Sequence, residues 1–206
     1  MNIECPLPEA LTSIPVENCP FRFDQIVRFG FQRRAAAAFA SPAVMITLAP
    51  WTPKLVATDD EKVVMSPFFA GMVIPQSEAL TTGGNDNSTF NGIPDYNGEG
   101  MVTVTGQFKN LSPLAKTALD KLAQESIASP VGVTNLELFM FNKNKVGFSI
   151  GTKGVQVYNF RVSSVGSEGF NAPNIHNFSF NLPGDWDTGL TSFTPIFDPF
   201  TELNNA

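Results

Sequence analysis

Proline and glycine interrupt this chain so often that only one stretch leaves room for a long helix. There are 16 prolines and 16 glycines among its 206 residues. Proline removes a backbone donor and clashes inside a helix, and glycine weakens the interiors of helices and strands. The chain also contains 19 phenylalanines, a residue that is enriched in strands. This composition predicts short strands joined by many turns.

The one stretch with a clear helical period covers residues 112–126. Ser112 is a suitable N-cap, and Pro113 takes the first helical position, where a missing N–H costs nothing. Two apolar ridges with a spacing of four residues follow: Leu114, Ala118 and Leu122, and then Ala115, Leu119 and Ala123. We expect this helix to place its apolar stripe on a sheet and its polar side chains in solvent.

Eight segments have the character of strands, and two of them alternate cleanly. The eight are residues 24–33, 44–48, 62–65, 100–108, 136–142, 145–150, 154–164 and 174–182. The apolar face of the two clean segments carries Val102, Val104 and Phe108 in one and Phe178, Phe180 and Leu182 in the other. Such alternation indicates strands with one buried face. Neither face of residues 24–33 is purely apolar.

The order of these elements predicts a mainly β fold in one domain, residues 1–206. It favours a two-sheet β-sandwich or barrel with one flanking α-helix, a long loop and extended terminal arms. Residues 51–56 add a short helical turn with Thr52 as its N-cap. The prolines of residues 1–20 favour an N-terminal arm, and residues 193–206 form a C-terminal arm with apolar anchors but no regular period.

The longest excursion covers residues 76–100, which are rich in residues that tolerate positive φ and form local turns. Its polar run consists of Gly83, Gly84, Asn85, Asp86, Asn87 and Ser88. The glycine pair resembles a phosphate cradle, but no phosphate-binding motif follows and no helix begins directly after it. Because long ordered loops in compact domains are usually functional, we predict an assembly loop here.

Charged residues make up only 16% of the chain, well below the usual quarter. So few charges fit a subunit that is covered by its neighbours, although a β-rich monomer with a polar uncharged surface has the same composition. The formal net charge of −6 argues against a general nucleic-acid binder, which needs a basic face. It does not argue against a surface past which DNA slides without binding.

No arrangement of residues predicts an enzyme, a cofactor or a metal site. Two cysteines and one histidine do not complete a four-ligand zinc set at motif spacing. His176 lies on the same face of its predicted strand as the neighbouring phenylalanines, which favours a packing role over a catalytic one. The pair Arg33 and Arg34 is typical of a solvated strand end, and residues 59–61 are typical of a polar turn.

Cys5 and Cys19 could form a disulfide in an oxidising compartment. The first residues show no signal peptide, so we expect synthesis in the cytoplasm and reduced thiols. No apolar run approaches the length of a membrane span.

A further pattern consists of short stretches spread over most of the chain. They are Cys19 to Phe21, Gln25 and Ile26, Phe31 to Arg33, Ser66 and Pro67, Gly83 to Thr89, Gly92 to Pro94, Phe178 to Phe180, Leu182 and Pro183, and Trp186. Together they resemble small virion structural proteins of tailed phages and prophages of Bacteroidetes bacteria. The order of elements is also similar to that of phage tail tube proteins, which have two packed β-sheets, one flanking helix, a long loop and terminal arms.

This resemblance implies a virion protein that forms hexameric rings, stacked into a hollow tube through whose lumen DNA passes. It implies that the loop of residues 76–100 contacts the next ring and that both termini are candidates for contacts between subunits. The implied assembly interface comprises the run from Gly83 to Ser88 together with Phe197 and Phe200. An acidic lumen would let DNA pass with little friction. The first strands are ambiguous, which leaves open which sheet faces the lumen.

Two other functions remain open at this point. One is a capsid decoration or head-completion protein, which would have other virion proteins as partners. The other is a carbohydrate-binding β-sandwich, whose candidate stacking platforms are Trp51, Tyr96, Tyr158 and Trp186.

Overall fold

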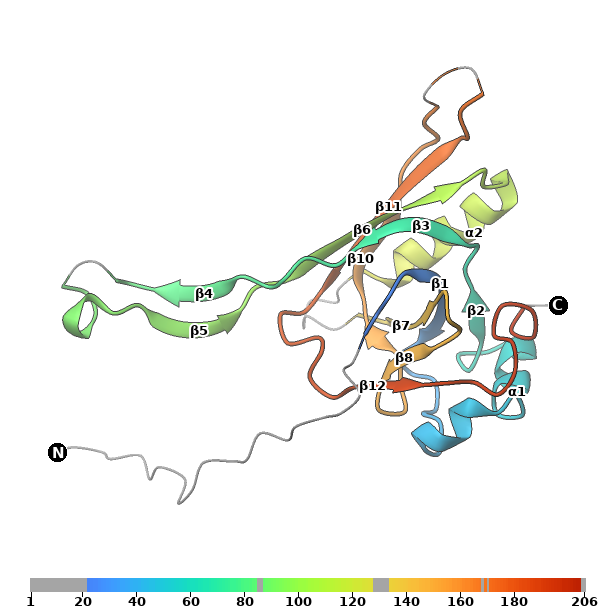
Figure 1. Ribbon diagram of the computed structural model, residues 1–206, viewed down its shortest axis with the longest axis horizontal. Helices are drawn as coiled ribbons and strands as arrows, with labels where there is room; N and C mark the ends of the chain where they lie inside the picture. The colour runs from blue at the N-terminus through green and yellow to red at the C-terminus, as the bar shows by residue number, and fades with distance from the viewer. Residues whose placement is uncertain (1–21, 85–86, 128–133, 168, 170, 205–206) are drawn as a thin grey trace.

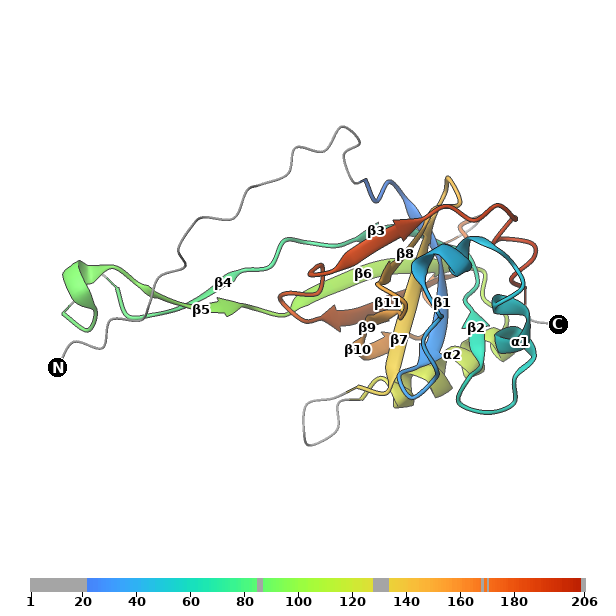
Figure 2. The same cartoon turned by 90° about the horizontal axis from the view of Figure 1, so that it is seen from below.

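The computed structural model describes residues 22–84, 87–127, 134–167, 169 and 171–204. It confirms a mainly β fold of antiparallel sheets, with no closed barrel among these residues. Two larger sheets form the body, and a third, two-stranded sheet projects far from it (Figures 1 and 2). The expected N-terminal arm and both cysteines lie outside the described residues.

The first large sheet has six strands, and the second has four. The strands of the first are β1 (Ile26–Arg33), β2 (Val63–Met65), β7 (Leu136–Asn142), β8 (Gly147–Ile150), β9 (Val155–Gln156) and β12 (Leu190–Phe193). The strands of the second are β3 (Phe69–Val73), β6 (Val102–Lys109), β10 (Tyr158–Val162) and β11 (Ile175–Leu182). The first follows the order β12-β8-β7-β1-β2, with β9 paired to β7, and the second follows β10-β11-β6-β3. The hairpin predicted from residues 136–142 and 145–150 is confirmed as β7 and β8.

Phenylalanine rings fill the space between the two sheets. Phe29 of β1 contacts Phe178 and Phe180 of β11, with 5.7 Å between ring centroids in each pair. The alternation predicted for β6 and β11 is confirmed, because their inward positions are buried. Phe178 lies over Gly106, its partner in β6, and a Cβ at that glycine would collide with the ring. The core therefore requires a residue without a side chain at this position.

A second apolar cluster covers the other face of the first sheet. At its centre is Trp51, fully buried, whose indole N–H donates to the carbonyl of Met45 at 2.9 Å. Phe139 and Phe141 of β7 point into this cluster, while the residues that alternate with them point into the first. Since β1 is also covered on both sides, nearly all of its residues are buried. This explains why residues 24–33 show no clean apolar face in the sequence.

The strand predicted at residues 44–48 is wrong. Most of these residues lie in a 3₁₀ helix, η1 (Pro42–Ile46). Pro42 supplies the fixed φ of a helical start. The carbonyl of Met45 is occupied by the Trp51 indole rather than by a neighbouring strand.

The helical turn predicted at residues 51–56 is confirmed as α1 (Trp51–Val56), but its cap is not. The helix begins at Trp51 with Pro50 in the N-cap position. The hydroxyl of Thr52, the expected cap, instead donates to the carbonyl of Leu48 at 3.3 Å. The need to bury Trp51 in the second cluster sets the start of this helix.

The strand predicted at residues 154–164 is divided between the two sheets. Val155 of β9 pairs with Leu138 in the first sheet, whereas Val162 of β10 pairs with Phe178 in the second. Between them, the buried Val157 donates its N–H to the carbonyl of Leu136 at 3.1 Å. The chain therefore crosses from one sheet to the other at this residue.

The predicted helix is confirmed as α2 (Pro113–Glu125), and the Ser112 hydroxyl accepts the N–H of Ala115 at 3.1 Å. The predicted stripe is only partly correct. Leu119 is buried, but Leu114 is 81% exposed and Ala118 is also exposed. At the end of the helix, the hydroxyl of Ser126 accepts the N–H of Phe160 in β10 at 2.7 Å. This bond helps to set the helix rotation that leaves Leu114 and Ala118 in solvent, while Leu122 of the same predicted ridge packs against the core.

Candidate functional site

The predicted loop of residues 76–100 contains a two-stranded antiparallel ribbon. Its strands are β4 (Ala79–Thr82) and β5 (Asp95–Glu99), joined through the 3₁₀ turn η2 (Phe90–Gly92). Ala79 pairs with Glu99 and Thr82 with Asp95, with an irregularity in the register between Leu80 and Thr81. The chain enters from β3 and leaves into β6, so the ribbon continues the edge of the second sheet (Figure 2). Below, "the ribbon" means residues 74–101.

The base of the ribbon is closed by hydrogen bonds between its two sides and lies against the turn after β11. The N–H of Gly100 donates to the carbonyl of Glu78 at 2.8 Å, and the Ser77 hydroxyl donates to the Glu99 carboxylate. Gly184, in the turn after β11, lies so close to the Glu99 backbone that a Cβ there would collide with it. The two hydrogen bonds join the sides of the ribbon, and the close approach of Gly184 to Glu99 is its contact with the body.

The tip of the ribbon contains the sequence-predicted assembly residues. Gly83 and Gly84 have φ values of +71° and +100°, and a Cβ at Gly84 would press on the ring of Pro94. Asn87 and Ser88 are exposed at the tip, while Asn85 and Asp86 lie outside the described residues. The glycine run thus makes the reversal of the ribbon possible. Whether its residues contact another subunit stays a prediction.

The ribbon also exposes large apolar side chains, which the sequence reasoning missed. Five of the twelve exposed large apolar side chains among the described residues belong to it. They are Leu80 (51% exposed), Phe90 (86%), Ile93 (65%), Tyr96 (63%) and Met101 (55%), and Val73, the last residue of β3, directly precedes the ribbon at 57%. Because two thin strands have no second layer, these side chains have no core to enter. Phe90 and Ile93 were the available signal, since both are large apolar residues in a run of Gly, Asn, Ser and Thr.

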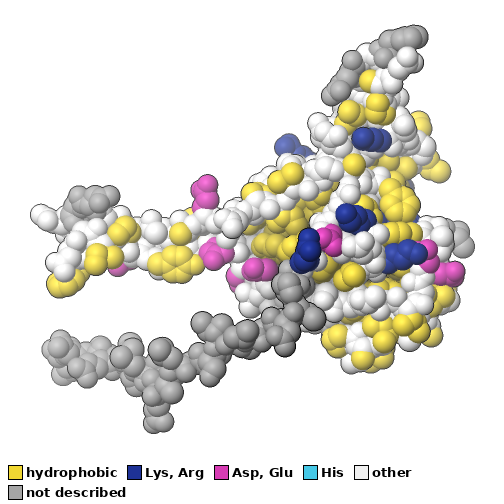
Figure 3. All heavy atoms as spheres, in the orientation of Figure 1, with side chains coloured by type: hydrophobic (Ala, Val, Ile, Leu, Met, Phe, Trp, Pro, Cys, Tyr) yellow, Lys and Arg dark blue, Asp and Glu magenta, His cyan; other side chains and the backbone are white. Residues whose placement is uncertain are grey.

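The charge of the ribbon has one sign. No lysine or arginine occurs between Lys62 and Lys109 in the sequence, whereas Glu78, Asp95 and Glu99 lie on the ribbon. Figure 3 shows this face of the ribbon with hydrophobic and acidic side chains, and the basic side chains gathered on the body. The ribbon is therefore an acidic arm with apolar contact points.

The other predicted interface residues, Phe197 and Phe200, lie elsewhere. The segment after β12 is at the end of the body opposite the ribbon (Figure 1), and both rings are half-buried against the second apolar cluster. Arg28 of β1 donates to the Phe200 carbonyl at 2.8 Å and to the Asn204 side chain at 2.6 Å. Burial lowers the pKa of the Arg28 guanidinium, which also lies 5.1 Å from the centre of the Phe68 ring. The described part of this arm is thus fastened to its own body, and the structure does not bring it to the ribbon tip.

The outer face of the second sheet is a bare polar surface. Its exposed side chains on β6 include Thr103, Thr105 and Gln107, and the Thr103 hydroxyl bonds to Asn181 of β11 at 3.0 Å. A hollow of about 530 Å³ lies on this face, and the Arg161 guanidinium there bonds to Ser179 at 2.8 Å. The residues that line the hollow include no carboxylate. The charged side chains of these strands on this face are two cations, Arg161 and Lys109, so the face differs from the acidic lumen expected above.

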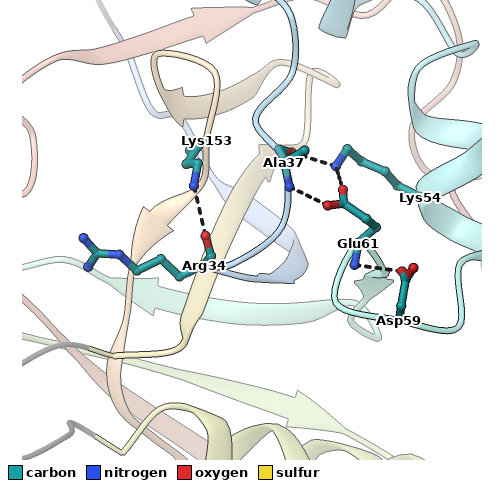
Figure 4. A network of polar contacts seen from close by, with 6 residues as sticks. All are labelled: Arg34, Ala37, Lys54, Asp59, Glu61 and Lys153. Atoms are coloured by element: carbon teal, nitrogen blue, oxygen red, sulfur yellow. Dashed lines mark hydrogen bonds and ion pairs between the residues drawn. The ribbon is translucent and has the colours of Figure 1, made fainter.

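The basic pair and the acidic cluster form connections at the end of β1. Arg33 binds the carboxylates of Asp60 and Glu125, each at 2.5 Å. Figure 4 shows the neighbouring network, in which Lys54 binds Glu61 at 2.7 Å and Lys153 donates to the Arg34 carbonyl at 2.9 Å. The hydrogen bond from Lys54 lowers the pKa of Glu61, helped by the N–H of Ala37. These groups hold residues 34–41, which connect β1 to η1, on the first sheet.

Three of the four aromatic rings considered for sugar stacking are not freely exposed. Trp51 is fully buried, and Trp186 is partly buried against Phe23, with 5.7 Å between ring centroids. Tyr158 is also partly buried, which leaves Tyr96 on the ribbon as the one exposed ring of the four. His176 is buried and bonds through Nδ1 to the Ser163 carbonyl at 3.1 Å, as expected of a packing residue.

The described residues hold neither a clustered set of metal ligands nor a membrane-spanning helix. No group of three or more His, Cys, Asp or Glu side chains is placed to hold a metal ion. None of the helices there has the length and apolar character needed to cross a membrane.

Comparison with known proteins identifies no family. No protein-family model matches the chain, and no curated protein does. Among solved structures, the chain is similar to one in the cryo-EM structure of the anti-feeding prophage baseplate, refined with six-fold symmetry. That similarity has a TM-score of 0.35 at 9% identity, and it covers 88% of this chain and 100% of the other. A likeness this distant says nothing about what this chain does.

Proposed function

We propose that this chain is a structural, self-assembling virion protein, and specifically a subunit of a phage-like tail tube. In this proposal copies of the chain form rings, hexameric by the family resemblance, and the ribbon of each ring contacts the next ring. The chain has no catalytic role and needs no cofactor, and its partners are copies of itself and other virion proteins.

The observation that carries the proposal is the set of apolar side chains on the ribbon. A soluble monomer has little reason to hold Phe90, Ile93 and Tyr96 in water at the end of a long arm. Full burial of one such side chain contributes about 1.5–3 kcal/mol. Docking of the ribbon therefore makes on the order of 5 kcal/mol available before the cost of association is subtracted.

The polar face of the second sheet supports the same proposal. A lumen through which DNA moves must not bind it, so hydroxyl and amide side chains without a basic patch are suitable. The outward positions of β6 and β11 have this chemistry, with Thr105 and Asn177 as examples. In the proposed tube this face lines the lumen, and low friction comes from neutral polar groups rather than from acidic ones.

The test compares assembly of the native chain with that of a double variant, Phe90→Ser with Ile93→Ser. Sedimentation velocity across a wide concentration range, with electron micrographs of the same samples, is expected to show rings or tubes for the native chain. The double variant should fold but remain in smaller species. The matched control is Val56→Ser, which removes an apolar side chain that is 66% exposed on the body. The control should assemble normally.

A native chain that stays monomeric at all concentrations would count decisively against the proposal. The position of the protein on the particle separates a tail tube subunit from a capsid decoration or head-completion protein. Labelled antibody on the capsid rather than along the tail would favour the latter.

A further inference from the structure

One face of α2 points away from the body and carries charge of the opposite sign to that of the ribbon. Leu114 is 81% exposed, and Thr117, Ala118 and Lys121 are exposed on the same side of the helix. A surface helix normally turns its apolar positions toward the core, so an exposed leucine and alanine four residues apart are unexpected. They form a second apolar strip without a covering layer. Below, "the α2 strip" means these four residues with Lys109.

The charge of the α2 strip is positive. Lys109 stands at the end of β6 and Lys121 in the third turn of the helix, both exposed. Neither has a hydrogen bond or ion pair with another described residue, whereas Lys116 nearby is neutralised by Asp120. The strip therefore presents two ammonium groups that have no partner among the described residues. Lys121 also shares a hollow with Asp59, Asp60 and Glu125, and Arg33 pairs with the last two of these carboxylates. The ribbon presents carboxylates beside apolar side chains, which is the complementary arrangement.

The two surfaces lie in different parts of the molecule. The ribbon occupies one end of the long axis, and β6 runs from it across the body to the corner where α2 begins (Figure 1). A subunit therefore cannot cover its own strip with its own ribbon. A contact between different surfaces of identical subunits is heterologous, and such contacts build rings or open stacks rather than closed dimers.

We infer that the α2 strip is the docking site for the ribbon of a second copy of this chain. The inference rests on the proposed function and adds to it the surface that receives the ribbon. Glu78 and Asp95 on the ribbon pair with Lys109 and Lys121 on the strip, and the exposed rings and aliphatic side chains of the ribbon cover Leu114 and Ala118.

Charge reversal tests the pairing directly. The ribbon variant carries Glu78→Lys and Asp95→Lys, and the strip variant carries Lys109→Glu and Lys121→Glu. Each variant alone should require at least about tenfold more protein for half-assembly, because two attractive pairs become repulsive. An equimolar mixture should assemble at the native concentration, because reversed ribbons then meet reversed strips and native ribbons meet native strips. The matched control carries Arg22→Glu and Lys143→Glu, two exposed cations away from the strip.

The outcomes distinguish the two proposals. If the native chain does not assemble, the proposed function fails and this inference fails with it. If the native chain assembles and loses assembly in the Phe90→Ser, Ile93→Ser variant, but the strip variant assembles normally, only the present inference is overturned. The same conclusion holds if both reversed variants fold, as judged by thermal melting, and their mixture fails to assemble. Restored assembly in the mixture, with an unaffected control, supports it.

Discussion

Glu137 offers a sharp test of how the first sheet is built. This residue of β7 is only 4% exposed, and it pairs across the sheet with Gln32 of β1 and Gln156 of β9. Burial raises the pKa of the Glu137 carboxyl from 4.5 to about 7, although Lys153, Arg34 and the N–H of Gly154 favour the charged form. The carboxyl is thus held in a place that suits its neutral form.

The sign of the pH dependence follows from linkage. A group whose pKa is higher in the folded chain contributes stability that is complete below its unfolded pKa and is lost as the pH rises through its folded pKa. For Glu137 the window runs from 4.5 to about 7. At about 1.4 kcal/mol for each pH unit, the loss across this window is at most roughly 3.5 kcal/mol. Relaxation of the surroundings makes the measured value smaller.

The perturbation is Glu137→Gln, which keeps the shape and removes the titration. The free energy of unfolding in urea, followed by Trp fluorescence at pH 5 and pH 8, is the measurement. We expect the variant to be close to the native chain at pH 5 and about 1–3 kcal/mol more stable at pH 8. Glu202→Gln, at an exposed position, is the control and should change little at either pH. The reasoning would be refuted if Glu137→Gln were less stable than the native chain at pH 8. It would also be refuted if the two unfolding free energies differed by the same amount at pH 5 and pH 8.

Two further predictions concern the body. Arg28→Met should lower the free energy of unfolding by about 2–4 kcal/mol and speed hydrogen exchange in the segment after β12, because the Phe200 and Ser66 carbonyls lose their buried donor. An unchanged exchange rate would show that the segment stays bound without Arg28. The control is Arg22→Met, at an exposed position, which should be neutral. Gly106→Ala should cost about 1–3 kcal/mol of unfolding free energy in urea, because the new Cβ meets the Phe178 ring. The control is Gly166→Ala, whose new Cβ makes only an ordinary contact, and an equal cost at the two positions would contradict this packing.

Local patterns predicted those elements whose two faces differ. β6 and β11 alternate in sequence because one side meets the core and the other meets solvent. The start of α2 was predictable because Ser112 and Pro113 act within one turn. Each of these features depends on neighbours in the chain.

The remaining features depend on distant contacts. β1 is covered on both sides, and the C-terminal segment binds Arg28 of this strand, which no pattern within residues 24–33 records. Residues 154–164 look like one strand although their partners, Leu138 and Phe178, belong to different sheets. The rotation of α2 depends on Ser126 and Phe160, so the ridge of Leu114 and Ala118 was assigned to the wrong side.

The sequence predicted an excursion at residues 76–100 but not its structure, and its role in assembly stays a prediction. The glycine run from Gly83 correctly marked an excursion with a reversal, because positive φ is readable from sequence. That the excursion is a paired ribbon depends on the register between β4 and β5, which polar residues specify weakly. Its exposed apolar side chains became evident only when the absence of a second layer was known.

The central claim is that the ribbon joins copies of this chain, and deletion of residues 83–88 tests it most directly. Electron micrographs and sedimentation of the purified native and deleted chains, at matched concentrations, are the measurement. We predict rings or stacked tubes for the native chain, and for the deleted chain a folded species, with the same circular dichroism as the native body, that no longer stacks. Assembly that is unaffected by the deletion would contradict the claim.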